Sequence, residues 1–270
     1  MTGNLKQDLF EHFIKDIAAH VNYMSFYFQG EPYIHPAFLD MVKVAKSNRI
    51  YVSTSTNAHF LDEQKAIKTV ESGLDRLIIS IDGTTQESYA SYRKEGQLSK
   101  VIEGTKNIIK AKKELNAKTP YIIFQFLVVR ANEHQIEEVK ALAKELGVDE
   151  VKYKTAQIYD YKNGSSLMPV NERFSRYAKQ ADGHYTLKHK LLNQCWKLWH
   201  ACVITWDGWV VPCCFDKDAK YQMGNLKHES LQTVWKNKAY QQFRRNIVNS
   251  RSSIDICTNC TEGCKVFSDV

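Results

Sequence analysis

Cysteine is absent from the first 194 residues of this 270-residue chain, and all seven cysteines lie in its last third. Long apolar runs are also missing, since none approaches the roughly 18 residues that a membrane-spanning helix needs. The early charges of Lys6, Asp8 and Glu11 exclude the apolar centre of a signal peptide. We therefore expect a cytoplasmic protein without a membrane partner. In that reducing compartment, its cysteines are metal ligands or free thiols rather than disulfides.

Glycine and proline are scarce, with 12 and 5 residues, and a hydrophobic fraction of 43 % excludes a disordered chain. The net charge of +7 comes from dispersed lysines, and the densest run is Lys110, Lys112 and Lys113. That run is typical of a solvated helix face, so we do not expect nucleic acid as a partner.

Apolar periodicity predicts strands and helices that alternate along the first 155 residues. Strands are expected at 22–28, 50–56, 76–82, 121–129 and 149–155, and helices at 5–21, 36–48, 62–72, 85–93, 98–115 and 134–146. Helical crossovers between hydrophobic strands predict an α/β fold with a parallel sheet and helices outside it. Because the order begins on a helix, we expect that a first strand is missing. Residues 156–192 are predicted to be a linker with one short helix, and residues 193–270 a small cysteine-rich domain.

Four predicted strands end in polar residues, and ligands gather at the carboxyl ends of parallel strands. These ends hold Gln29-Gly30-Glu31, Ser55-Thr56-Asn57, Ser80-Ile81-Asp82-Gly83 and Arg130-Ala131-Asn132-Glu133, with Tyr92-Arg93 beyond the third. Each alone is typical of a turn or helix cap. Together they predict a site for a zwitterionic, ribose-bearing molecule. Glu31 would accept from an ammonium group, Arg93 would bind a carboxylate, and the short polar side chains would pair with sugar hydroxyls.

The cysteines form the pattern C-x12-G-x4-C from Cys195 to Cys213, followed after a gap by Cys257-x2-Cys260. Four thiolates that converge from two such places suit an iron–sulfur cluster or a structural zinc ion. Cys264 is an alternative ligand. Cys202 lies in an apolar run, which predicts a core residue. Cys214 neighbours Cys213 and is expected to point the other way.

At these residues the chain resembles the radical S-adenosylmethionine superfamily, whose members have a partial (β/α)6 barrel. Gly30-Glu31-Pro32 is similar to the motif that binds the methionine amino group, with Gln29 in place of the first glycine. Ser55-Thr56-Asn57 is similar to the family's Ser-Thr-Asn-Gly turn, with Ala58 where glycine is usual. Ser80-Ile81-Asp82-Gly83 and Tyr92-Arg93 match the family's Ser-x-Asp-Gly turn and Tyr-Arg element in full. The resemblance implies these cofactor-binding residues: Gly30, Glu31, Thr56, Asn57, Ser80, Asp82 and Arg93.

The C-terminal part resembles the SPASM or shortened Twitch extension, which binds auxiliary iron–sulfur clusters. The resemblance covers nearly the whole chain and implies three domains: a partial barrel at 1–155, a linker at 156–192 and an auxiliary-cluster domain at 193–270. It implies one auxiliary [4Fe–4S] cluster held by Cys195, Cys213, Cys257 and Cys260. It also implies a peptide or small-molecule substrate of unknown identity and a reductant such as flavodoxin or ferredoxin.

The family's C-x3-C-x2-C, which holds the catalytic cluster that binds S-adenosylmethionine, is not in this sequence. We expect a fragment of a longer protein in preference to a naturally shortened, inactive relative. Three functions stay open at this point: the core of a radical enzyme that is inactive alone, a non-catalytic protein with a structural four-cysteine zinc or iron–sulfur site, and a relative that works with a second chain. The catalytic residues are unknown.

Overall fold

The computed structural model describes residues 3–260 and 267–268 of the chain. These residues divide into two compact units. The sheet unit comprises residues 23–46, 51–188 and 267–268, and the cysteine unit comprises residues 3–22, 47–50 and 189–260.

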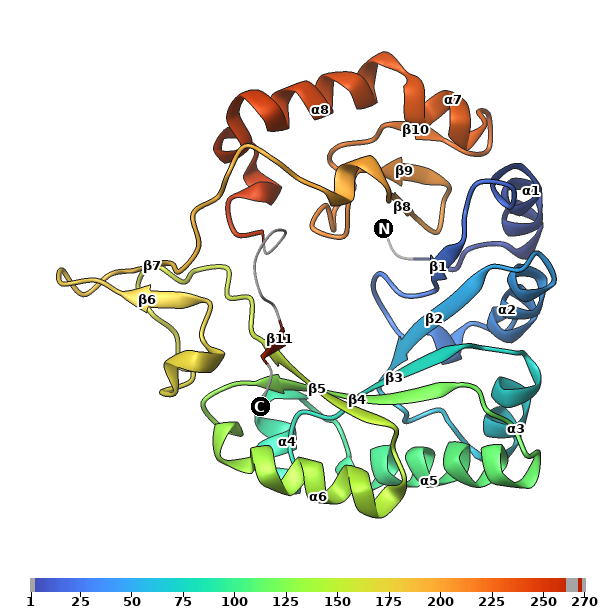
Figure 1. Cartoon of the computed structure of the whole chain (residues 1–270), viewed down its shortest axis with the longest axis vertical. Helices are drawn as coiled ribbons and strands as arrows, with labels where there is room; N and C mark the ends of the chain where they lie inside the picture. The colour runs from blue at the N-terminus through green and yellow to red at the C-terminus, as the bar shows by residue number, and fades with distance from the viewer. Residues whose placement is uncertain (1–2, 261–266, 269–270) are drawn as a thin grey trace. The chain divides into compact units, whose positions relative to one another are not determined.

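The sheet unit is built on one six-stranded sheet in the order β1-β2-β3-β4-β5-β11 (Figure 1). Its strands are β1 (Tyr23–Ser25), β2 (Tyr51–Thr56), β3 (Arg76–Ser80), β4 (Tyr121–Val128), β5 (Glu150–Thr155) and β11 (Phe267–Ser268). The first five pair in parallel, as predicted. This parallel sheet with helices confirms the predicted fold class. β11 pairs antiparallel with β5 and was not predicted.

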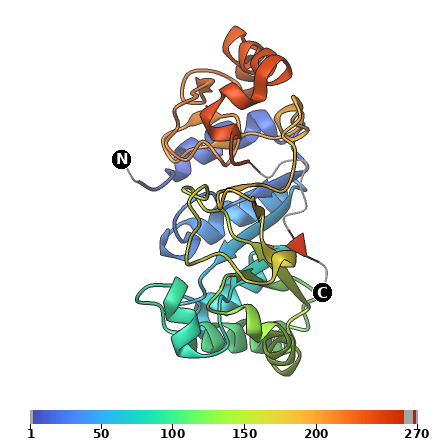
Figure 2. The ribbon, with the colours of Figure 1, turned by 90° about the vertical axis from the view of Figure 1, so that its left-hand side faces the viewer.

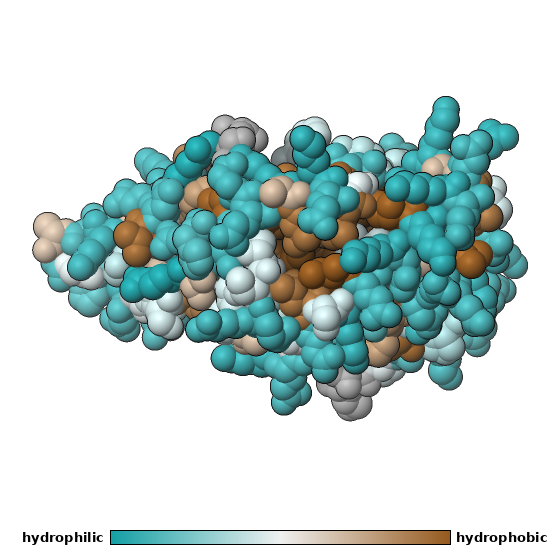
Figure 3. All heavy atoms as spheres, turned by 90° about the horizontal axis from the view of Figure 1, so that it is seen from below, coloured by the Kyte–Doolittle hydropathy of each residue, from teal (hydrophilic) through white to brown (hydrophobic). Residues whose placement is uncertain are grey.

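Helices connect successive parallel strands, and α3, α5 and α6 lie along one side of the sheet (Figure 1). The helices are α2 (Phe38–Ser47), α3 (Glu63–Glu71), α4 (Gln86–Tyr92), α5 (Leu98–Glu114) and α6 (Ile136–Leu146), with 3-10 turns η1 (Pro32–Ile34) and η2 (Glu133–Gln135). The face seen in Figure 3 is mostly hydrophilic, with an apolar strip near its centre, as expected for helices that turn polar residues to solvent. No helix among the described residues is long and apolar enough to cross a membrane.

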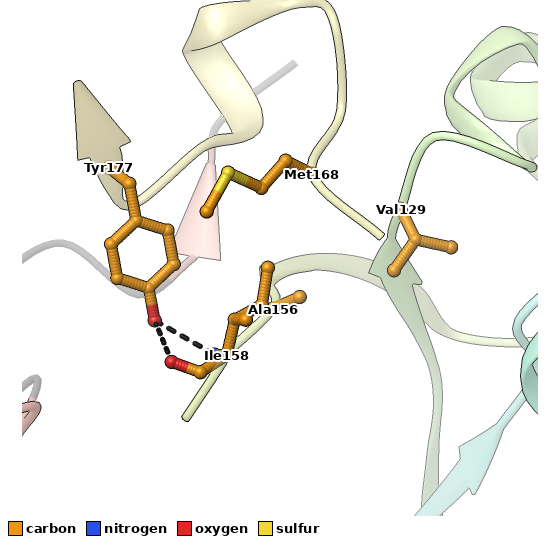
Figure 4. Close-up of a cluster of buried hydrophobic side chains, with 5 residues drawn as sticks. All are labelled: Val129, Ala156, Ile158, Met168 and Tyr177. Atoms are coloured by element: carbon orange, nitrogen blue, oxygen red, sulfur yellow. Dashed lines mark hydrogen bonds between the residues drawn. The ribbon is translucent and has the colours of Figure 1, made fainter. Parts of the chain in front are cut away.

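Residues 156–188 contain more order than the predicted linker with one short helix. They form the 3-10 turn η3 (Glu172–Phe174) and an antiparallel hairpin of β6 (Tyr177–Lys179) and β7 (Tyr185–Leu187). Gly183 has a φ of 88°, the left-handed conformation that a tight turn needs. Figure 4 shows why this segment is ordered: Tyr177 packs with Met168 and Ile158, and its hydroxyl bonds to the backbone nitrogen and oxygen of Ile158. The strands are too short to show periodicity in the sequence.

The cysteine unit combines the first helix of the chain with residues from its C-terminal part. It holds α1 (Gln7–Ile17), η4 (Lys197–Trp199), the antiparallel strands β8 (Val203–Ile204), β9 (Trp209–Val211) and β10 (Gly224–Asn225), then α7 (Leu231–Lys236), α8 (Lys238–Ser250), η5 (Arg251–Ser253) and η6 (Asp255–Cys257). α1 lies beside α7 (Figures 1 and 2), and the Asp16 carboxylate accepts from the Leu231 backbone N–H at 2.9 Å. The grouping of α1 differs from the predicted domains, which assign residues 1–155 to the barrel.

Gly104 provides a test of how α5 packs against the turn that follows β2. A Cβ atom at Gly104 would lie 2.4 Å from the Ala58 carbonyl oxygen and 3.2 Å from the Leu61 Cβ. Alanine favours a helix over glycine by about 1 kcal/mol, but this contact needs a backbone shift. We expect Gly104→Ala to lower the free energy of unfolding by about 1–3 kcal/mol in urea denaturation. Lys106→Ala, on the exposed face of α5, is the control and should have little effect. A more stable Gly104→Ala protein would contradict this packing.

Candidate cofactor and metal sites

Glu31 joins the carboxyl ends of β1 and β2. Its Oε1 accepts from the Thr56 hydroxyl at 2.8 Å and from the Tyr33 backbone N–H at 3.2 Å, and its Oε2 accepts from the Asn57 backbone N–H at 2.7 Å. A carboxylate has about four acceptor positions, so three donors leave Oε2 with room for one more. Three predicted site residues are therefore brought together here.

Two backbone positions shape this end of the sheet. Gly30 has a φ of 80°, and a Cβ there would meet nothing within 4 Å, so its conformation rather than crowding favours glycine. Ala58 has a φ of 59°, in the left-handed region that disfavours alanine. It stands where the resemblance expects glycine, so the backbone keeps the conformation despite the different residue.

Asp82 lies beyond the end of β3 with its side chain fully buried. Its carboxylate accepts from the Arg93 Nε at 2.6 Å and from the Leu127 backbone N–H at 2.8 Å. Burial raises the pKa of Asp82, and the charge of Arg93 opposes that rise. Arg93 thus favours the ionised form of the buried carboxylate, which burial disfavours. Its Nε is committed to Asp82, which leaves the terminal guanidinium nitrogens for the predicted contact with a ligand carboxylate.

Two further polar side chains fix the ends of β3 and β4. Asn132 is completely buried, donates to the carbonyls of Asp82 and Leu127, and accepts from the Val129 N–H. Gln135 accepts from the Thr84 N–H at 3.0 Å and from the Ser88 hydroxyl at 2.7 Å. Sequence reasoning placed Asn132 at a polar strand end without assigning it to the site. It missed Gln135, because nothing distinguishes this residue within a predicted helix.

The predicted polar residues therefore form two hydrogen-bonded groups, one around Glu31 and the other around Asp82. They follow the neighbouring parallel strands β2 and β3, so they lie along the same edge of the sheet. Ser80 is buried at the end of β3. A carboxylate and a guanidinium along one edge suit the ammonium and carboxylate of an amino acid.

The cysteine unit draws three separate segments together. Gly208, with a φ of 89°, makes the turn between β8 and β9, which explains the glycine between Cys195 and Cys213. The loop after Cys213 is tied to η6, because the Tyr221 hydroxyl donates to Asp255 at 2.7 Å and Lys220 pairs with the same carboxylate at 3.1 Å.

Arg251 connects the segment before Cys195 with Cys257. Its Nη1 donates to the Gln194 carbonyl at 2.9 Å, and its backbone N–H donates to the Asn193 side chain at 3.0 Å. Its side chain also hydrogen-bonds to the Cys257 thiol. The residues next to Cys195 are thereby held close to Cys257.

The four predicted ligands act on one another electrostatically. Burial raises the pKa of Cys213 to about 12, and the charges of Cys257 and Cys260 add to that rise. Burial likewise raises the pKa of Cys257 to about 12, with contributions from Cys260 and Cys195. Bound metal would favour the thiolates that burial disfavours.

The chemistry of these donors fits an iron–sulfur cluster, since thiolates are its usual ligands. Within residues 3–260, however, no three His, Cys, Asp or Glu side chains are gathered so as to hold a metal ion. The ligand set therefore stays a prediction. Of the other cysteines, Cys214 is exposed, Cys202 is partly buried, and Cys264 lies outside the described residues.

Two family models match the chain. The model of the radical SAM superfamily matches residues 4–143, and the model of the SPASM iron–sulfur cluster-binding domain matches residues 195–261. The chain therefore belongs to the radical SAM superfamily and carries a SPASM domain, which confirms the predicted resemblance. Membership implies iron–sulfur clusters and the binding of S-adenosylmethionine.

Some proteins are similar to this chain in sequence, and some solved structures are similar to it in fold. A "tungsten-containing aldehyde ferredoxin oxidoreductase cofactor-modifying protein" of Pyrococcus furiosus is 26 % identical, over 96 % of this chain and 80 % of its own length. The solved structure of anSMEcpe with bound AdoMet has a TM-score of 0.68 at 16 % identity, over 98 % of this chain and 81 % of that one. Streptococcus suis SuiB bound to S-adenosylmethionine also has a TM-score of 0.68, at 13 % identity, over 98 % and 67 %. These structures support the fold.

The buried ion pair gives a test of the sheet edge. Asp82→Asn removes the charge that faces Arg93, and we expect the free energy of unfolding to fall by about 2–4 kcal/mol. This is below the 3–5 kcal/mol of a fully buried pair, because the Arg93 side chain is one-third exposed. Chemical denaturation measures the change. Glu63→Gln breaks the exposed pair with Lys110 and should change stability little. Equal stability of Asp82→Asn and the parent protein would show that this pair contributes nothing.

Proposed function

We propose that this chain forms the S-adenosylmethionine-binding core and the auxiliary-cluster domain of a radical enzyme. In the complete enzyme, one electron would cleave S-adenosylmethionine to methionine and a 5′-deoxyadenosyl radical, and this radical would abstract hydrogen from a substrate. The observation that carries the proposal is electrostatic: Cys257 and Cys260 act on the buried Cys213 thiol, and Cys260 and Cys195 act on the buried Cys257 thiol. These thiols come from segments far apart in the sequence, and a shared cluster would require all of them.

The sheet edge is proposed to bind the methionine part of S-adenosylmethionine. Glu31 would accept from its ammonium group at the remaining position of Oε2, and Thr56 and the Asn57 backbone hold that carboxylate in place. Arg93 would donate to the ligand carboxylate, while Asp82 fixes the direction of its side chain. Gly30, Ser80 and Asn57 would line the same edge. Each residue named here either binds the ligand or orients a residue that binds it.

The kind of substrate is proposed from relatives of the chain. One anSMEcpe structure holds AdoMet with a peptide, and one BtrN structure holds AdoMet with 2-DOIA. A peptide or small molecule is therefore the proposed substrate class, and a flavodoxin or ferredoxin the proposed source of electrons. The alternative is a non-catalytic protein whose four cysteines hold structural zinc, since zinc accepts the same four thiolates.

The nature of the metal separates these two functions. Protein purified without oxygen should be brown and contain about four irons and four sulfides per chain, as a four-cysteine cluster requires. Cys257→Ala should abolish iron binding. Cys202→Ala is the matched control and should leave the iron content unchanged. Stoichiometric zinc in a colourless preparation would favour the structural alternative.

A separate prediction concerns cleavage of S-adenosylmethionine. These 270 residues contain no cysteine before Cys195, and a cluster with four protein ligands has no open iron. We expect no 5′-deoxyadenosine from this chain alone, even with a strong reductant and a filled auxiliary cluster. A C-x3-C-x2-C segment supplied ahead of α1 should restore cleavage, measured by chromatography.

In that restored protein, Glu31→Ala and Arg93→Ala should each weaken binding of S-adenosylmethionine by about 1.5–3 kcal/mol, the contribution of a charge-assisted hydrogen bond. Glu63→Ala, at an exposed pair, is the control. Reductant-dependent formation of 5′-deoxyadenosine by the present chain would contradict the prediction that it does not cleave S-adenosylmethionine alone.

A further inference from the structure

Arg76, the first residue of β3, lies on the face of the sheet that points away from α6. The Tyr153 hydroxyl on β5 donates to the carbonyl of Ile136, the first residue of α6, at 3.1 Å, so Tyr153 faces that helix. The strand register puts Phe126 and Ile79 on the same side as Tyr153. Successive residues of a strand point to opposite faces, and Arg76 precedes Ile79 by three residues. Its side chain is therefore on the face opposite α6.

Tyrosine side chains flank Arg76 on both neighbouring strands. Its guanidinium carbon lies 5.4 Å from the ring centre of Tyr51 on β2, and that ring stacks on Tyr23 with 5.7 Å between ring centres. On β4, Tyr121 is paired with Arg76 in register. Tyr23 and Tyr121 are 49 % and 42 % exposed, so Arg76 lies at an end of the sheet that a ligand can reach.

The carboxylates at the amino ends of β3 and β5 do not balance the charge of Arg76. Each of them already pairs with a lysine: Asp75 with Lys46 at 2.6 Å, Asp149 with Lys112 at 3.2 Å and Glu150 with Lys152 at 3.4 Å. In the part of the chain that the structure describes, Arg76 forms no ion pair, and its Nε is buried without a hydrogen-bond partner. A guanidinium has five N–H donors and no acceptor, so an anion is the ligand that fits this site.

The same face carries further polar side chains with unused hydrogen-bonding groups. They are Ser53, Ser55, Ser80 and Gln125. The register pairs Ser53 with Arg76 and Gln125 with Ser80, and Ser55 is two residues beyond Ser53, so all four share the face opposite α6. Their side chains form no hydrogen bond within the described residues, although the three serines are buried. Native proteins pair most buried polar groups, so unused ones indicate a place for a ligand.

These side chains form a row that connects Arg76 with the proposed cofactor edge. Ser80 ends β3 beside that edge, and it lies four residues beyond Arg76. At about 3.3 Å per residue, the row is about 13 Å long. An extended peptide of about four residues spans this length, whereas a single amino acid does not.

We propose that the face opposite α6 binds an extended acidic peptide, whose carboxylate pairs with Arg76. The Ser53 and Ser55 hydroxyls and the Gln125 amide then hydrogen-bond to the polar groups of the peptide. A carboxylate supplies the charge that Arg76 lacks, and its two oxygens match the two-pronged donor face of a guanidinium. That the bound peptide is the substrate of the radical reaction rests on the proposed function.

The first test measures binding of two pools of acetylated pentapeptides by equilibrium dialysis. The pools differ only in one position, which is Glu in one and Gln in the other. The parent protein should bind the Glu pool about tenfold more tightly or better, as expected for a charge-assisted hydrogen bond. Arg76→Gln should remove this preference. Arg173→Gln, at an exposed arginine of the sheet unit, is the matched control and should retain it. Ser55→Ala should weaken binding of both pools alike, because it leaves the charge in place.

The second test needs no variant. Phenylglyoxal modifies arginine side chains, and mass spectrometry of tryptic peptides reports the rate at each one. The Glu pool should slow modification of Arg76 and leave that of Arg173 unchanged, and the Gln pool should protect neither. If Arg76→Gln does not fold, as judged by circular dichroism, this measurement on the parent protein decides.

The outcomes separate the peptide site from the proposed function. Equal affinity of the parent protein for the two pools, or unslowed modification of Arg76, would overturn the inference and leave the iron and sulfide content as an independent test of the proposed function. Glutarate that protects Arg76 as well as the Glu pool does would also overturn it, since so small an acid does not span the row. A preference for Glu in a protein that holds zinc instead of iron and sulfide would support the peptide site and contradict the proposed function.

Discussion

The buried carboxylate of Asp82 is the constraint on which the ligand edge of the sheet depends. It lies where β3 ends, and Arg93 and the Leu127 amide both donate to it. Asn132 then ties the Asp82 backbone to the end of β4. One charge therefore fixes two strand ends and the end of α4. Glu31 has the corresponding role for β1 and β2, so hydrogen bonds orient the polar groups of this edge without a ligand, which lowers the entropic cost of binding.

Most of the sheet unit could be predicted, because its signals are local. Apolar periodicity located every parallel strand and every crossover helix within a few residues, and helical crossovers leave only a parallel arrangement. Three features were not predicted from the sequence, for a physical reason: the β6–β7 hairpin, β11 and the grouping of α1. The hairpin strands have three residues each, β11 has two, and α1 packs on α7 from the far end of the chain. Contacts between distant segments leave no mark on local periodicity.

The candidate sites also contain residues that the sequence can identify and residues that it cannot. Cysteine spacing and polar strand ends identify residues whose type reports their chemistry, as with Cys257 and Glu31. Residues that support them are ordinary in the sequence. Gln135 lies in a helix, Asn132 in a turn, and Arg251 in a basic, polar stretch, yet each connects two elements through hydrogen bonds. Their roles depend on which carbonyls and thiols reach them in the folded chain, and no spacing rule predicts that.

Arg93 and Arg244, one in each unit, differ in how the charge of the side chain is balanced. In the sheet unit, the partly exposed guanidinium of Arg93 has the buried Asp82 carboxylate as its partner, so its charge is balanced without a ligand. In the cysteine unit, Arg244 is buried among aromatic rings with no described carboxylate against it, and its charge opposes the rise that burial causes in the pKa of Cys202. The protein itself thus supplies a counter-charge for Arg93, whereas no described carboxylate supplies one for Arg244.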